Sequence, residues 1–84
     1  MNIERGKVNL AGAQIASIEG VEEVWSVSGR YDLVAIIRIR HIEDLAKIAT
    51  EKMATVDGIT HTESMVAFKK ISPNDMAGMF DLGS

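Results

Sequence analysis

The residues best suited to binding a small charged molecule form one short segment, Gly29-Arg30-Tyr31-Asp32. A tight turn between two strands needs only glycine and a polar neighbour, so this segment carries more chemistry than a turn requires. A carboxylate beside backbone N–H groups suits a zwitterion, because Asp32 accepts from an ammonium while main-chain donors hold a carboxylate. The alternative is that Asp32 caps the turn and Tyr31 packs on its neighbour. Both interpretations fit the segment.

Catalytic and metal-binding patterns are missing from the sequence. His41 and His61 lack the i, i+4 spacing that places two imidazoles on one metal ion. The chain has no cysteine, and its serines and glycines form neither a Gly-x-Ser-x-Gly elbow nor a phosphate loop. An acid and base pair of Asp32 with His61 or Glu63 does not follow from spacing alone. We therefore predict no catalytic residues, no metal, no cofactor and no enzyme activity.

Size and charge restrict the chain further. Its 84 residues are enough for one domain, which we assign to residues 1–84 with a C-terminal tail at 72–84. A net charge of −3 offers no basic surface for a nucleic acid backbone, so direct DNA binding is not expected. The longest aliphatic run, Leu33 to Ile37, is far shorter than the ~20 residues of a membrane span. We predict a cytoplasmic protein.

Hydrophobic periodicity predicts the elements around the turn. Apolar residues at helical spacing predict a helix over about 7–19, and β-branched residues predict strands at 21–28 and 33–40 that form a hairpin. A second helix begins at His41 or beside it, with an apolar stripe of Ile42, Leu45, Ala46, Ala49 and Met53. Residues 59–71 alternate as a long final strand, and Ser72-Pro73 opens a short C-terminal helix.

With residues 1–4 as a short first strand, the order is βαββαβ, an α+β ferredoxin-like sandwich. Both helices of this plan lie on one side of the sheet, which leaves the other side uncovered. Val34 and Ile36 make that side apolar, so we predict sheet-to-sheet dimerisation through Val34, Ile36, Val66 and Phe68. The alternative is that residues 76–82 fold back over this face.

Two stretches carry a family resemblance. Gly20 to Val34, with its Gly-Val-x-x-Val strand and Gly-x-Tyr-Asp turn, and Thr62 to Phe68 resemble the effector-binding (RAM) domain of the Lrp/AsnC family. The resemblance runs from Glu4 to about Phe80. It implies a ferredoxin-like fold of the dimeric α/β-barrel type, whose dimers assemble further into tetramers or octamers.

The resemblance also implies a ligand site between dimers for an amino-acid effector. Carried over, Asp32 takes the ammonium, the backbone of 29–31 takes the carboxylate, and Arg30, His61 and Glu63 tune the preference for a side chain. The implied ligand-binding residues are Gly29, Arg30, Tyr31, Asp32, His61, Thr62, Glu63 and Ser64. Ser64 stands where the family often has threonine.

The sequence departs from full family members, which carry an N-terminal helix-turn-helix. We therefore expect a stand-alone regulatory domain that oligomerises and modulates full-length Lrp/AsnC regulators. One alternative is an assembly module without a ligand. Another is a small dimeric monooxygenase-type enzyme with a pocket between helices and sheet, which the aliphatic character of the helix-facing positions disfavours.

Overall fold

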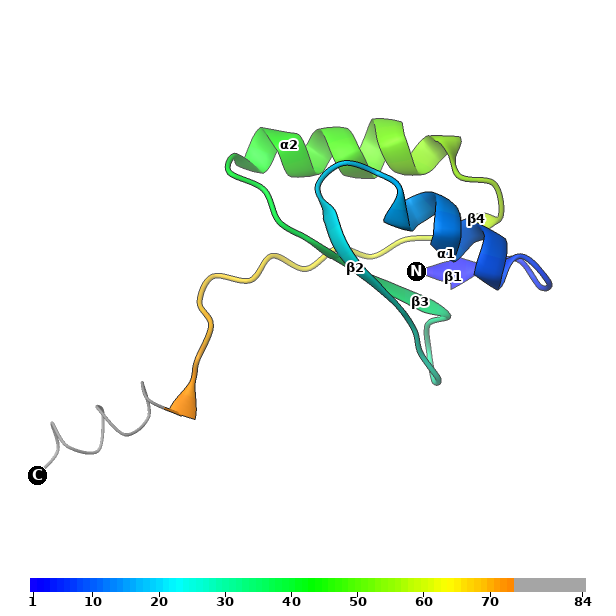
Figure 1. Ribbon diagram of the computed structural model, residues 1–84, viewed down its shortest axis with the longest axis horizontal. Coiled ribbons are helices and arrows are strands. Elements are labelled where there is room, and N and C mark those ends of the chain that lie inside the picture. Colours follow the sequence, from blue (N-terminus) through cyan, green and yellow to red (C-terminus); the bar gives the residue numbers. More distant parts are fainter. Residues whose placement is uncertain (74–84) are drawn as a thin grey trace, which may run out of the picture.

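The structure is a computed structural model that describes residues 1–73. Four strands and two main helices follow one another along the chain (Figure 1). The strands are β1 (Asn2–Ile3), β2 (Val21–Ser26), β3 (Leu33–Ile37) and β4 (Ile59–His61). The first helix is α1 (Val8–Ala16), and the second helical segment begins with α2 (Ile42–Lys47). The short first strand is as predicted.

Helix α1 forms where the apolar spacing predicts it, but ends sooner. Ala11 and Ile15 are buried, and Val8 and Ile18 pack against the same core. The helix ends where backbone bonding changes to three-residue spacing: the Ser17 N–H donates to the Gln14 carbonyl at 3.2 Å, and the Ile18 N–H donates to the Ile15 carbonyl at 3.0 Å. The predicted range of about 7–19 is thus longer than the helix itself.

The predicted hairpin is present, with β2 antiparallel to β3. Trp25 lies opposite Val34, and Ser26 lies opposite Leu33. The turn between the strands uses Gly29 at a φ of 115°, a conformation that glycine adopts without a side-chain clash. The pattern of residues along the two strands is therefore sufficient to predict the β2–β3 hairpin.

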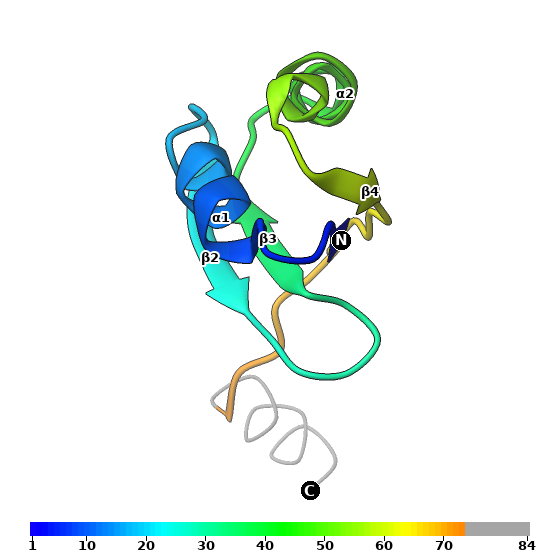
Figure 2. The same ribbon diagram turned by 90° about the vertical axis from the view of Figure 1, so that its right-hand side faces the viewer.

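The two rows of β3 face different surroundings. Leu33 is buried, and Ala35 and Ile37 pack against the core, whereas Val34 and Ile36 are 37% and 39% exposed. Both helices contribute to that core, since it contains Ala11 and Ile15 of α1 and, from the second helical segment, Ile48 and Met53. The helices therefore lie on one side of the β2–β3 pair, as Figure 2 shows for α1, and the side with Val34 and Ile36 is uncovered.

The second helix differs from the prediction in the face that it buries. After α2 the chain continues as a π-helix, Ile48–Lys52, and a 3-10 turn, Met53–Thr55. Ile48 and Met53 are buried, whereas three predicted members of the stripe are exposed: Ile42, Ala46 and Ala49. The wider π turn places residues five apart on one face, so the predicted stripe is correct for Met53 and wrong for these three positions.

The sheet pairs only partly as a ferredoxin-like sheet. β1 pairs with β4, and β2 pairs with β3, as two separate antiparallel pairs. Met1 joins them, because its carbonyl accepts from the N–H groups of Asp32 at 3.0 Å and Leu33 at 3.2 Å. The strands therefore follow one another in the order β4, β1, β3, β2, with one residue joining the two pairs.

The predicted final strand over 59–71 is wrong in length. β4 ends at His61, and residues 62–71 are exposed and have no regular structure. The reason is that β1, its only partner among residues 1–73, contributes two residues. Val66 and Phe68 therefore lie outside the sheet, 51% and 97% exposed. The predicted C-terminal helix after Pro73 and the 76–82 segment lie outside the described residues.

Within residues 1–73, no helix has the length and apolar character needed to cross a bilayer.

Candidate functional site

Strand β1 brings the two segments of the predicted site together. Asn2 pairs with His61 of β4 on one side. The side-chain Nδ2 of Asn2 donates to the Arg30 carbonyl of the turn at 2.9 Å. The 29–32 turn and the start of the 61–64 segment therefore flank the same two-residue strand, although they are far apart in the sequence.

Asp32 anchors the turn to β1. Its Oδ2 accepts from the Ile3 N–H at 2.8 Å, and its own N–H donates to the Met1 carbonyl at 3.0 Å. The carboxylate therefore holds the turn against β1, which differs from the alternative in which Asp32 caps the turn itself. An ionised carboxylate has about four lone-pair positions, so one accepted bond leaves capacity for a ligand.

Two acidic residues of the predicted site, Asp32 and Glu63, act on the N-terminal ammonium beside β1. The Met1 ammonium donates to the Leu33 carbonyl at 2.8 Å. Burial lowers the pKa of this ammonium, while Asp32 and Glu63 act in the opposite direction. Both carboxylates therefore act on one positive charge, the Met1 ammonium, which brings the turn and the segment after β4 into electrostatic contact.

The remaining predicted residues are mostly exposed. Gly29 and Arg30 are exposed, and Tyr31 is half-buried. Thr62, Glu63 and Ser64 follow β4 without joining the sheet, and their side chains lie in solvent. The structure thus joins the turn to His61 through β1, while Ser64 belongs to the unpaired segment.

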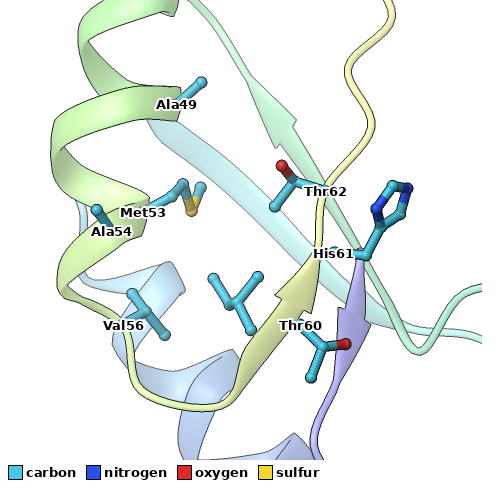
Figure 3. Close-up of a pocket in the computed structure, with 8 residues that line it drawn as sticks. Ala49, Met53, Ala54, Val56, Thr60, His61 and Thr62 are labelled. Atoms are coloured by element: carbon cyan, nitrogen blue, oxygen red, sulfur yellow. The ribbon is translucent and has the colours of Figure 1, made fainter.

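An open cleft lies beside this region and was not predicted from the sequence. It has a volume of about 290 Å³ and lies between the end of the second helical segment and β4 (Figure 3). Its lining comprises Ala49, Met53, Ala54, Val56, Ile59, Thr60, His61 and Thr62. Small alanines facing a Thr-His-Thr sequence are the signal that could have revealed it.

The cleft differs from the pocket of a monooxygenase-type enzyme. Such a pocket would be enclosed between helices and sheet, whereas this cleft opens to solvent. Thr60, one of its polar residues, already donates its hydroxyl to the Asn2 carbonyl at 3.2 Å. Trp25 lies on the uncovered face and is 57% exposed. Among residues 1–73 there is also no cluster of three or more potential metal ligands.

Comparison with known proteins gives a consistent result. The model of the Lrp/AsnC ligand binding domain matches residues 1–77. The HTH-type transcriptional regulator PF0250 of Pyrococcus furiosus, itself uncharacterised, is 40% identical over 58 residues, which are 69% of this chain and 39% of that protein. YugG of Bacillus subtilis, of the same description, is 33% identical over 68% of this chain and 34% of its own length. The chain therefore spans about two-fifths of these relatives, or less.

Solved structures show the same fold. TTHA0845 from Thermus thermophilus superposes with a TM-score of 0.79 at 34% identity, covering 84% of this chain and 89% of that one. The hypothetical protein PHS023 from Pyrococcus horikoshii gives a TM-score of 0.76 at 27% identity, covering 83% and 84%. With the family match over residues 1–77, the chain belongs to the Lrp/AsnC ligand-binding domain family.

Proposed function

We propose that this chain is a regulatory domain that binds an amino-acid-like effector and associates through its uncovered sheet face. The observation that supports it best is the convergence of two polar segments on β1. Asn2 bonds to the Arg30 carbonyl and pairs with His61, so residues separated in sequence form one surface. A ligand contacting both segments would also contact the strand that joins the two halves of the sheet.

The chemistry of this surface suits a zwitterion. Asp32 and Glu63 act on the Met1 ammonium, and they would act in the same way on the ammonium of a ligand. The turn around Gly29, which has a positive φ, supplies backbone N–H groups of the kind that bind a carboxylate. Arg30, His61 and Glu63 would tune the preference for the ligand side chain.

Association would complete the site. Its residues lie on an open surface, whereas a bound small molecule normally has most of its surface buried. Dimers formed through the uncovered face, and tetramers or octamers assembled from them, would supply the second wall. Because curated relatives are described as HTH-type transcriptional regulators, we propose that co-assembly with such regulators is how binding affects transcription.

Calorimetry on the intact protein tests ligand binding. The protein, with its assembly state measured, is titrated with each of the twenty amino acids. For an amino acid that binds, Asp32→Asn should weaken binding by about 10- to 100-fold, because it removes a charge-assisted bond to the ammonium. Asparagine keeps an oxygen for the Ile3 N–H, so folding is preserved.

Glu19→Gln is the matched control, since Glu19 is an exposed carboxylate just before β2, at the end away from the turn. It should bind as the parent does. Absence of heat with all twenty amino acids in a confirmed assembly would contradict the effector role. It would favour the alternative of an assembly module without a ligand.

A further inference from the structure

The tip of the turn between β2 and β3, residues 28–31, has few contacts with the rest of the fold. All four residues are exposed or half-buried, and Figure 2 shows the tip as part of an open loop beyond the two strands. A Cβ built on Gly29 would meet nothing within 4 Å. The Val27 N–H donates to the Asp32 carbonyl at 3.1 Å, which closes the turn below the tip. A backbone segment with so few contacts needs another group to fix its orientation.

The side chain of Asn2 is that group. Its Nδ2 donates to the Arg30 carbonyl at 2.9 Å, and within residues 1–73 this is the one hydrogen bond that residues 28–31 make. Strand β4 holds Asn2 in turn, because the Asn2 carbonyl accepts from the Thr60 hydroxyl at 3.2 Å and Asn2 pairs with His61. Asn2 therefore connects the tip of the turn to the sheet.

This hydrogen bond fixes the direction of a backbone N–H group as well. The peptide bonds of residues 1–73 are all trans, so the Arg30 C=O and the Tyr31 N–H, which share one plane, point in opposite directions. With the carbonyl held by Asn2, the Tyr31 N–H points out of the turn. It has no hydrogen-bond partner in the described part of the chain, so it is free to bind a ligand.

The orientation of this peptide plane decides which charge the turn can bind. An outward N–H attracts a carboxylate, whereas a carbonyl oxygen in the same place would repel it. Rotation of the plane by half a turn would exchange the two groups. The bond from Asn2 opposes this rotation, because the Arg30 oxygen would have to leave its donor.

We propose that Asn2 is a positioning residue of the effector site: it holds the Arg30 carbonyl away from the ligand and so presents the Tyr31 N–H to the ligand carboxylate. Asn2 acts through the turn and does not contact the ligand. The inference rests on the proposed function, in which the turn binds the carboxylate of a zwitterion.

The group that receives the ammonium does not depend on Asn2. The Asp32 Oδ2 accepts from the Ile3 N–H at 2.8 Å, and the Asp32 N–H donates to the Met1 carbonyl at 3.0 Å. These two bonds hold Asp32 without help from the Asn2 side chain. Loss of that side chain should therefore affect the carboxylate end of the ligand and leave the ammonium end unchanged.

Calorimetry on the full chain tests this division with two ligands. One is an amino acid that binds the parent, and the other is the amide of the same amino acid, which keeps the ammonium but has a neutral carboxamide. Asn2→Leu keeps the size of the side chain and removes its donor. It should weaken binding of the amino acid by about three- to ten-fold, as expected for one hydrogen bond, and leave binding of the amide as in the parent.

Two further variants interpret the result. Asp32→Asn should weaken binding of both ligands, because both carry the ammonium. Thr60→Val is the matched control, since it removes another exposed hydrogen bond to Asn2 without changing the bond to Arg30, and it should bind both ligands as the parent does. Equal losses for the amino acid and its amide in Asn2→Leu would show a merely structural role and overturn the proposal.

Nuclear magnetic relaxation of the backbone amides tests the role of Asn2 without a ligand. Asn2→Leu should lower the order parameters of residues 29–31 relative to the parent, and Thr60→Val should leave them unchanged. Unchanged order parameters in Asn2→Leu would overturn the positioning role even if amino acids bind. Lower order parameters in a protein that binds none of the twenty amino acids would instead contradict the proposed function, and the assignment of Asn2 to an effector site with it.

Discussion

Gly20, which precedes β2, is the glycine whose replacement should disturb the core most directly. Its φ is 97°, and a Cβ built there would lie 2.8 Å from the Ile48 Cδ1. We predict that Gly20→Ala lowers the free energy of unfolding by roughly 2–4 kcal/mol, the sum of backbone strain and overpacking. Chemical denaturation measures it.

Gly6 is the control, with a φ of 85° and nothing within 4 Å of the added Cβ. Gly6→Ala should cost only the backbone strain, about 1–2 kcal/mol. Equal losses in the two variants would contradict a role for the contact with Ile48.

Lys7 makes the stability of the fold depend on pH in the alkaline range. Its Nζ donates to the Asp57 Oδ2 at 2.9 Å and lies 3.3 Å from the Glu4 Oε2. The hydrogen bond with Asp57, then that with Glu4, raises the pKa of Lys7 above its usual 10.5. A raised pKa in the folded state means that the contribution is fully present below the unfolded pKa and is lost as pH rises through the folded pKa.

The comparison variant is Lys7→Met, which keeps an aliphatic stem beside Gly58. We predict that the difference in melting temperature between parent and variant is constant from neutral pH to about pH 9 and shrinks above about pH 11. Thermal melts followed by circular dichroism measure it. A difference that persists unchanged at high pH would contradict a contribution from the lysine charge.

At the scale of single elements, the second helical segment depends on its π turn. We predict that Ile48→Ala costs about 2–5 kcal/mol, because Ile48 is 7% exposed and belongs to the core. Ile42→Ala is the control in the same segment, at 59% exposed, and should change stability by less than about 0.5 kcal/mol. Urea denaturation measures the loss of stability in each variant. A larger loss for Ile42→Ala than for Ile48→Ala would support the stripe predicted from regular helical periodicity.

The sequence predicts some elements better than others. The reason is that some elements form through contacts between residues close in the sequence, whereas others need a partner that is distant in the sequence. The β2–β3 hairpin depends on neighbouring residues, and its alternation predicts it well. The strand expected over 59–71 depends on a distant partner, and β1 supplies only two residues. The π turn at 48–52 changes the helical period, so Ile48 was missed as a core residue.

The candidate site follows the same division. The 29–32 turn stands out by composition and by family resemblance. The Asp32 bond to Ile3 joins residues 29 positions apart, which no local pattern reveals. The cleft beside β4 arises from the packing of a helix against a strand and was likewise not predictable from spacing.

At the scale of the whole molecule, the uncovered face should govern association. We predict that Val34→Thr with Ile36→Thr shifts the protein toward single subunits, because threonine keeps β-branching while adding a hydroxyl to the interface. The subunit itself should remain folded, since both positions are more than a third exposed. Analytical ultracentrifugation over a concentration series measures the shift.

Leu10→Gln is the control for this pair, because Leu10 is 58% exposed on α1 and away from the sheet face. It should leave the mass of the assembly unchanged. An unchanged mass in the double threonine variant would place the interface elsewhere.

The buried cluster of the subunit is small, namely Ile3, Ala11, Ile15, Leu33, Ile48, Met53 and Val56. A chain protected by so little interior opens often unless neighbours shield it. Its amide protons should therefore exchange with deuterium faster as the solution is diluted. Cellular abundance would then set how long each molecule survives proteolysis, which couples the lifetime of the protein to the rate at which it is made.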